Sequence, residues 1–164
     1  MPKMMSPNTA IWWVTNPAFD PEAPSAAMLT DAANISCAIV NGYELNPTKS
    51  DVDTSTNICD TAKVETPIRY NYAGNLTFNR ESDQANTTSA YARAFAFFGT
   101  TRNTGYLVRR TGYLSTVAAA VGHKVDSFKF INDVPKDLIE ENLINFSTKF
   151  SPQGVMELDT ALVA

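Results

Sequence analysis

Apolar and polar residues alternate over residues 68–78, and this alternation is the clearest pattern in the chain. One parity is apolar and consists of Ile68, Tyr70, Tyr72, Leu76 and Phe78. The other parity is polar and contains Arg69, Asn71, Asn75 and Thr77. A period of two residues predicts a strand with one buried face and one face in water. Gly74 lies inside this pattern and marks an expected bend or bulge.

Further segments of the C-terminal half have the same strand character. They are residues 106–110, 124–131, 143–150 and 155–163. In the third segment, Ile144, Phe146 and Phe150 oppose Asn145, Ser147 and Lys149, and in the fourth, Met156, Leu158 and Leu162 oppose Glu157 and Asp159. One-sided burial of this kind favours antiparallel strands.

One amphipathic helix interrupts the strands. Its apolar residues Tyr91, Ala94, Phe95 and Phe98 have the spacing of a helix face, with Thr87, Thr88 or Ser89 as the N-cap and Gly99 at the end. A shorter helix is expected over residues 26–29, after Ser25. The sequence therefore predicts a mainly β protein with one flanking α-helix, built as an antiparallel β-sandwich or as a curled sheet whose open side the helix covers.

The other segments are expected to lie outside the sheet, except for a strand-like run over residues 35–40. Residues 1–24 hold five prolines, and proline disrupts both helix interiors and sheet ladders. We predict that they form an extended N-terminal arm, and that residues 25–164 form one domain. Residues 44–63 are polar and lack either period, so they are predicted to be a long loop with a function of its own.

Composition and charge narrow the function further. The chain has 164 residues, of which 44% are hydrophobic and 18% charged, so it can bury a core. Its formal charge of -4 at pH 7 has the wrong sign for tight binding to phosphates. We recognise no secretory signal and no apolar run long enough for a membrane, and therefore expect residence in a cytoplasm, with Cys37 and Cys59 as free thiols.

The residue combinations that catalysis requires are not recognisable in the sequence. His123 is the single histidine, it has no plausible nucleophile beside it, and we interpret it as a solvent-exposed loop residue. Glu140 and Glu141 are adjacent, so their side chains should point apart instead of converging as an acid and a base. No enzyme activity and no cofactor are therefore expected.

A metal site is also not expected. Asp51, Asp53 and Ser55 begin like a calcium-binding loop, but Thr56 and Ala62 stand where such a loop needs a glycine and a bidentate glutamate. This departure excludes an EF-hand.

The cationic pair Arg109-Arg110 ends a predicted strand, and no glycine-rich phosphate cradle lies near it. Two interpretations remain open for this pair. It is either an exposed strand end that forms salt bridges, or a contact with an acidic patch on a neighbouring copy of the chain.

Several short strings of residues resemble a known family in their order along the sequence. They are SCAIVNGY (residues 36–43), ICD (58–60), VETP (64–67), YAGNLTF (72–78), GYLVRR (105–110), FKF (128–130) and FSPQG (150–154). In combination these strings resemble the major tail tube proteins of long-tailed, siphovirus-type phages of actinobacteria. The resemblance covers about residues 25–164, and the segment before Ser25 has no counterpart in it.

This resemblance implies a fold, an assembly and a set of partners. The fold would be a β-sandwich flanked by a helix, and hexameric rings would close their inner strands into a continuous barrel. The rings would stack into a tail tube that conducts DNA into the host. Partners would be further copies of the chain, the tape measure, tail terminator and distal tail proteins, and DNA in transient, non-specific passage. The protein would be assembled in the host cytoplasm and reside in the virion tail.

The resemblance and the alternation together assign candidate surfaces. The polar parity Arg69, Asn71, Asn75 and Thr77 is the candidate lumen face, which we expect to lack net positive charge so that DNA can slide. In the related proteins, a long loop between two early strands reaches the next ring. The candidate inter-ring loop residues are Asp51, Asp53, Asn57 and Asp60, and the candidate intersubunit contacts are Arg109 and Arg110.

Two alternative functions are compatible with the pattern. One is a neck or tail-terminator protein that stops at a single ring. The other is a carbohydrate-binding or adhesin-like β-sandwich in which Trp12 and Trp13 form a stacking platform. Adjacent residues of a strand face opposite ways, so Trp12 and Trp13 would make a poor shared platform.

Overall fold

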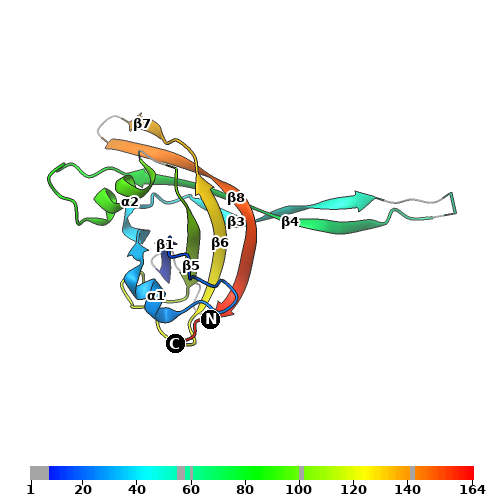
Figure 1. Cartoon of the computed structure of the whole chain (residues 1–164). Helices are drawn as coiled ribbons and strands as arrows, with labels where there is room; N and C mark the ends of the chain where they lie inside the picture. Colours follow the sequence, from blue (N-terminus) through cyan, green and yellow to red (C-terminus); the bar gives the residue numbers. More distant parts are fainter. Residues whose placement is uncertain (1–7, 55–57, 60, 100–101, 141–142) are drawn as a thin grey trace.

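The computed structural model describes residues 8–54, 58–59, 61–99, 102–140 and 143–164 (Figure 1). The elements are β1 (Thr9–Val14), α1 (Ala26–Asp31), β2 (Ala33–Asn34), the 3-10 helix η2 (Ser36–Ala38), β3 (Glu44–Thr54), β4 (Glu65–Asn79), α2 (Ala90–Phe98), β5 (Thr104–Thr111), β6 (Lys124–Asn132), β7 (Lys136–Glu140) and β8 (Leu143–Ala161). The protein is therefore mainly β, as the sequence predicts.

All strands belong to one antiparallel sheet. Seven of them follow the order β2-β1-β5-β6-β8-β4-β3, and β7 pairs with β8 beside this path. The sheet curls round a buried core without closing into a barrel (Figure 1). Of the two predicted architectures, the curled sheet is therefore the one that forms.

Strand β8 joins the two halves of the sheet. On one edge it pairs first with β7 and then with β6, and on the other edge it pairs with β4 only as far as Gly74 and Phe150. Between the pairs Phe128↔Met156 and Phe130↔Pro152 the register shifts, so β8 holds two extra residues there. Gly154 lies in this bulge with φ +78, a left-handed conformation that glycine adopts without strain.

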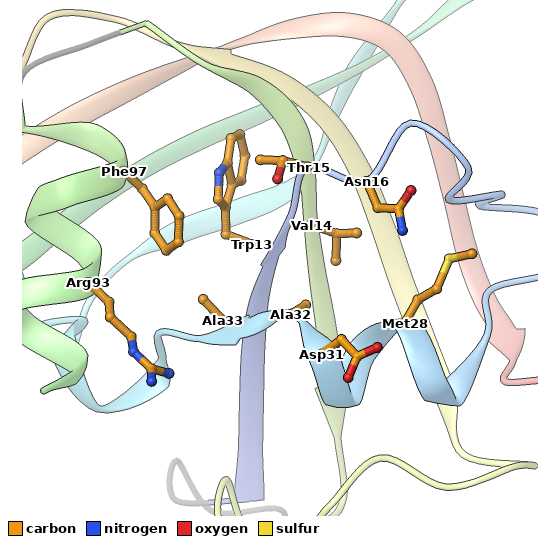
Figure 2. Close-up of a pocket in the computed structure, with 10 residues that line it drawn as sticks. All are labelled: Trp13, Val14, Thr15, Asn16, Met28, Asp31, Ala32, Ala33, Arg93 and Phe97. Carbon is orange, nitrogen blue, oxygen red and sulfur yellow. The ribbon is translucent and has the colours of Figure 1, made fainter. Parts of the chain in front are cut away.

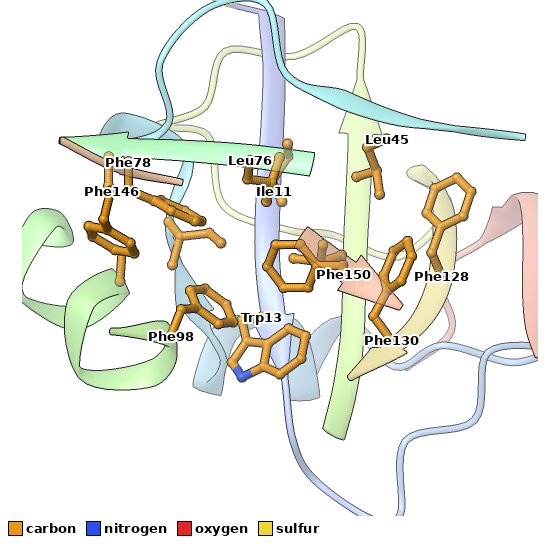
Figure 3. Close-up of a cluster of buried hydrophobic side chains, with 14 of the residues drawn as sticks. Ile11, Trp13, Leu45, Leu76, Phe78, Phe98, Phe128, Phe130, Phe146 and Phe150 are labelled. Carbon is orange, nitrogen blue, oxygen red and sulfur yellow. The ribbon is translucent and has the colours of Figure 1, made fainter. Parts of the chain in front are cut away.

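Aromatic side chains fill the concave side of the sheet (Figure 3). Phe78 stacks on both Phe98 and Phe146, and Trp13 packs edge-on against Phe98 at 4.9 Å between ring centroids. Helix α2 covers this side, and its N-cap Ser89 accepts a hydrogen bond from the Ala92 N–H at 3.1 Å. The predicted apolar helix face is confirmed as core packing.

The N-terminal segment differs from the prediction. Thr9–Val14 forms β1, which pairs with β2 on one edge and with β5 on the other, so this part of the predicted arm is a strand inside the sheet. The prolines flank β1 and do not interrupt it, because none lies between positions 8 and 16. Ile11 and Trp13 face the aromatic core, whereas Trp12 faces a second buried cluster on the outer side with Leu29 of α1.

Residues 44–63 also differ from the prediction, because most of this segment is strand and not loop. Glu44–Thr54 forms β3, which pairs with β4. The two strands extend together as a hairpin that projects far from the curled body (Figure 1). Leu45 is the single buried residue of β3. A strand that packs against no core does not need alternating apolar residues, and the sequence pattern therefore failed to show it. The strand-like run at residues 35–40 is likewise wrong, because η2 occupies its centre.

Candidate assembly surfaces

The projecting β3–β4 hairpin, which we term the arm, exposes apolar side chains. Tyr70 is 79% exposed and Ile68 is 61% exposed. They share the parity of buried Tyr72, Leu76 and Phe78, and the sequence therefore predicted them as buried. Alternation correctly identified the strand, but it could not show that the first residues of β4 leave the body.

Gly74 lies where β4 separates from β8. A Cβ atom at this position would lie 2.8 Å from Cζ of Phe130 and 3.1 Å from Cβ of Phe150. The glycine therefore permits a close approach to the core, and β4 shows no register shift against β3 at this residue. A bend or bulge was predicted at Gly74, but the register shifts between β3 and β4 lie further out along the arm, between Thr48 and Val52.

Asn71 stabilises one of these register shifts through two side-chain hydrogen bonds. Its Nδ2 donates hydrogen bonds to the Lys49 carbonyl at 3.1 Å and to Oδ1 of Asp51 at 3.0 Å. The register shifts between Thr48 and Asp51, so these bonds join the two ends of the bulge. Asn71, predicted for the lumen face, therefore has a structural role in the arm, and Arg69 lies still further out, exposed on the same arm.

The other two predicted lumen residues lie on the outer side of the sheet body. Asn75 pairs with Glu44 and Lys149, and Thr77 pairs with Ser147, which in turn pairs with Lys136. Directly paired residues share a side, so these residues form one surface, which we term the polar face: Glu44, Asn75, Thr77, Lys136, Ser147 and Lys149. These six residues include two lysines and one glutamate.

The predicted inter-ring residues fall in different places. Asp51 and Asp53 are exposed on β3, within the arm. Asn57 and Asp60 lie outside the described residues. The arm thus holds both described residues that were predicted to reach a neighbouring ring.

Arg109 is engaged within its own protomer. Its guanidinium donates to Oδ2 of Asp126 at 2.8 Å, to the Leu45 carbonyl at 2.6 Å and to Oδ1 of Asn46 at 3.2 Å. The pair with Asp126 is largely buried. Arg109 therefore joins β5, β6 and β3. It forms a salt bridge, as one of the two interpretations of the pair expected, but this salt bridge is largely buried within the protomer and not at an exposed strand end.

Arg110 is completely buried. Its guanidinium donates to the carbonyls of Leu114, Val117 and Ala118 at 2.8 to 3.0 Å and lies 3.2 Å from Nδ1 of His123. Burial lowers the pKa of Arg110. The residue has no exposed surface for a neighbouring copy, and the sequence signal was available, since it shares the parity of buried Val108 on β5.

His123 is not the solvent-exposed residue that we predicted. Its ring stacks on Tyr113 at 4.0 Å between centroids, beside the Arg110 guanidinium. Because an arginine can only donate, Nδ1 of His123 acts as the acceptor in this contact. The histidine therefore helps Arg110 to hold the loop between β5 and β6.

A surface pocket of about 420 Å³ lies between β1, α1 and α2 (Figure 2). Trp13 and Phe97 form its apolar wall, and Asp31 and Arg93 stand on opposite sides of it. The lining contains no histidine, cysteine or serine, and its hydroxyl and carboxylate groups are those of Thr15 and Asp31.

The described residues were also searched for metal-binding clusters, disulfides and membrane-spanning helices. No group of three or more His, Cys, Asp or Glu side chains is arranged there to hold a metal ion. Cys37 and Cys59 are exposed free thiols. Within the same ranges, no helix has the length and apolar character needed to cross a membrane.

The predicted stacking platform of Trp12 and Trp13 is wrong, because both side chains are buried, on opposite sides of β1.

Exposed apolar side chains such as Ile68 and Tyr70 on the projecting arm indicate a surface for contact with another molecule. The model of the phage tail tube protein family matches residues 1–164, and the chain belongs to this family. It is thus a structural component of the virion tail that self-associates into a tube. No curated protein matches the sequence with significance.

Proposed function

We propose that six copies of this chain form a ring, and that the rings stack into the tail tube of a siphovirus-type phage of actinobacteria. The tube conducts DNA into the host, and the protein has no catalytic role. Assembly takes place in the host cytoplasm with the tape measure, tail terminator and distal tail proteins. The family membership and the order of the strings of residues described above support this proposal.

The arm is the observation that carries the proposal. A two-stranded hairpin is marginally stable in water by itself, and this one projects from the body with Ile68 and Tyr70 exposed. Apolar side chains in that position gain stability only when another surface covers them. A neighbouring copy of the chain supplies such a surface in a tube.

The polar face supports the proposal that this part of the sheet forms the wall of the tube. Its opposite side is the aromatic core, so this part of the sheet separates water from the interior of the protein. A sheet with free edges gains from pairing with neighbouring copies, and a closed ring removes those edges. With the polar face towards the lumen, DNA would meet amides, hydroxyls and a few lysines.

Electron microscopy of the purified full-length protein tests the proposal. Wild-type protein should form stacked rings, and Ile68→Ser with Tyr70→Ser should raise the concentration needed for assembly by about tenfold or more, because aromatic and aliphatic anchors dominate interfaces. At concentrations where neither protein assembles, the thermal midpoint of this variant should equal that of the wild type, since both side chains are exposed in the single chain. Leu158→Ser, at an exposed position of the body, is the matched control.

Two results would contradict the proposal. A wild-type protein that remains monomeric at every concentration would exclude self-assembly into rings and tubes. Normal tubes from the doubly substituted arm would exclude the arm as an assembly element, although not the tube itself.

A further inference from the structure

The pocket between β1, α1 and α2 contains a buried hydrogen-bond donor that has no acceptor. Trp13 lines this pocket and is 2% exposed, and its indole Nε1–H finds no acceptor among the described residues. Figure 2 shows the indole nitrogen on the edge of the ring that is turned towards Phe97, which lines the same pocket. Buried polar groups are normally hydrogen-bonded. A ligand that brings an acceptor oxygen into the pocket would satisfy this donor.

The part of the pocket around Trp13 suits an aromatic ligand. Trp13 and Phe97 form its wall, and Val14 and Met28 also line it. The volume of about 420 Å³ lies within the range of about 300 to 1,000 Å³ that is usual for small-molecule sites. Aromatic rings pack favourably against one another in offset or edge-on arrangements. A single ring of a ligand therefore finds both space and partners here.

Two opposite charges lie away from the indole. Asp31 and Arg93 are exposed and stand on opposite sides of the pocket (Figure 2). Among the described residues, neither of them forms an ion pair. A group between them would meet a carboxylate on one side and a guanidinium on the other. A zwitterion, which carries an ammonium and a carboxylate, can form a charge-assisted hydrogen bond with each.

The fold keeps these groups within the reach of one small molecule. Trp13 pairs directly with Ala33 of β2, and Asp31 precedes Ala33 by only two residues. On the other side of the pocket, Arg93 and Phe97 are four residues apart on α2 and are therefore neighbours on one helix face. Three elements thus place a donor, a carboxylate and a guanidinium around the same cavity.

We propose that this pocket binds a free aromatic α-amino acid whose ring carries an acceptor oxygen, as in tyrosine. The α-ammonium binds Asp31 and the α-carboxylate binds Arg93. The ring packs against Trp13 and Phe97, and its hydroxyl oxygen accepts the hydrogen bond from the indole N–H. This binding is separate from assembly and does not rest on the proposed function.

Equilibrium dialysis of the full-length protein against isotopically labelled L-tyrosine tests the proposal. The dissociation constant should be about 1 mM or lower, as expected for a small ligand with few contacts. Three analogues each lack one of the recognised groups. Phenylalanine lacks the hydroxyl, tyramine lacks the carboxylate, and N-acetyltyrosine lacks the ammonium. Each should bind about threefold more weakly or worse.

Substitutions of the two charged residues should match the analogues one by one. Asp31→Asn should weaken the binding of tyrosine by about threefold to tenfold and leave that of N-acetyltyrosine unchanged. Arg93→Gln should weaken the binding of tyrosine to a similar degree and leave that of tyramine unchanged. Matched losses identify the interacting groups, as in a double-mutant cycle. Arg102→Gln, in an exposed ion pair elsewhere, is the control and should change neither.

The two tryptophans locate the bound ligand. Trp12 and Trp13 lie on opposite sides of β1, so nuclear magnetic resonance should show a tyrosine-dependent shift of the Trp13 indole N–H signal and none for Trp12. Absence of binding at millimolar tyrosine would overturn the proposal, as would binding that neither charge substitution weakens. Equal affinity for phenylalanine and tyrosine would overturn the role of the Trp13 N–H. The assembly of tubes would be unaffected by any of these results.

Discussion

The hydroxyl oxygen of Tyr72 accepts a hydrogen bond from the backbone N–H of Gln153 at 3.0 Å, across the point where β4 and β8 separate. It also accepts from the N–H of Val155 at 3.2 Å and donates to the Lys129 carbonyl at 2.6 Å. All three partners belong to the irregular part of the β6–β8 ladder. The side chain of Tyr72 thus replaces ladder bonds that the β8 bulge removes.

Tyr72→Phe should lower the free energy of unfolding by about 1 to 3 kcal/mol, because polar groups of the bulge lose a buried partner. Chemical denaturation of the assembly-incompetent arm variant, with and without this change, measures the effect on single protomers. Tyr113→Phe in the same background is the matched control, since Tyr113 is exposed and should tolerate the loss of its hydroxyl. Equal effects of the two changes would contradict the role assigned to Tyr72.

Arg110→Lys should destabilise the fold by about 1 to 3 kcal/mol or more. One ammonium group cannot reach the three carbonyls that the planar guanidinium binds, and at least one of them would be left buried without a donor. Arg102→Lys, in an exposed ion pair with Asp133, should change stability by less than about 0.5 kcal/mol. Denaturant titration would refute this prediction if the two variants behaved alike.

Phe98→Ala should cost about 3 to 5 kcal/mol, because the ring is fully buried between Trp13, Phe78 and Phe150 and its removal leaves a cavity. Phe95→Ala should cost less. Phe95 is only partly buried, and the guanidinium of Arg80 covers its ring at 3.9 Å. Thermal unfolding of the two variants tests this order, and the reverse order would show that the centre of the helix face lies at Phe95.

The Glu81 carboxylate, in the loop before α2, should make the stability of the protein depend on pH in the acid range. Hydrogen bonds from Ser89 and from the Asp83 N–H lower the pKa of Glu81. A folded-state pKa below the unfolded one means that the stabilisation is complete at neutral pH and is lost as the pH falls through the folded-state pKa. Thermal midpoints of the wild type and Glu81→Gln should therefore differ at neutral pH and converge in acid. A constant difference would contradict this.

Assembled wild-type tubes should bind DNA weakly, because the polar face offers few positive charges per copy and the protein is acidic overall. Asn75→Lys with Thr77→Lys should create DNA retention that decreases with added salt, since each new charge is repeated in every copy. Asn71 is left unchanged because it holds the arm bulge. Co-sedimentation over a salt series measures retention, and an unchanged result would exclude the polar face from the lumen.

Local sequence patterns were sufficient to predict the elements that have a local cause. The spacing of Phe95 and Phe98 predicted α2, with Ser89 among its three N-cap candidates. Alternation predicted most of β4 and of β8, and strand-like composition predicted β5 and β6. The short range of these signals explains their success, because capping and periodicity depend on neighbours within a few residues. The strings of residues also indicated the tail tube family, since their order is a property of the sequence itself.

Where these elements lie, and which of their faces are covered, depends on tertiary contacts. The same parity of β4 is exposed at Tyr70 and buried at Tyr72, because the strand leaves the body and loses its partner β8 beyond Gly74. Thr9–Val14 is a strand because β5 and β2 lie on either side of it. Arg110 is buried because the loop after β5 folds back and supplies carbonyls for its donors. Each of these outcomes requires segments that meet only in the folded protein, and no local pattern encodes their proximity.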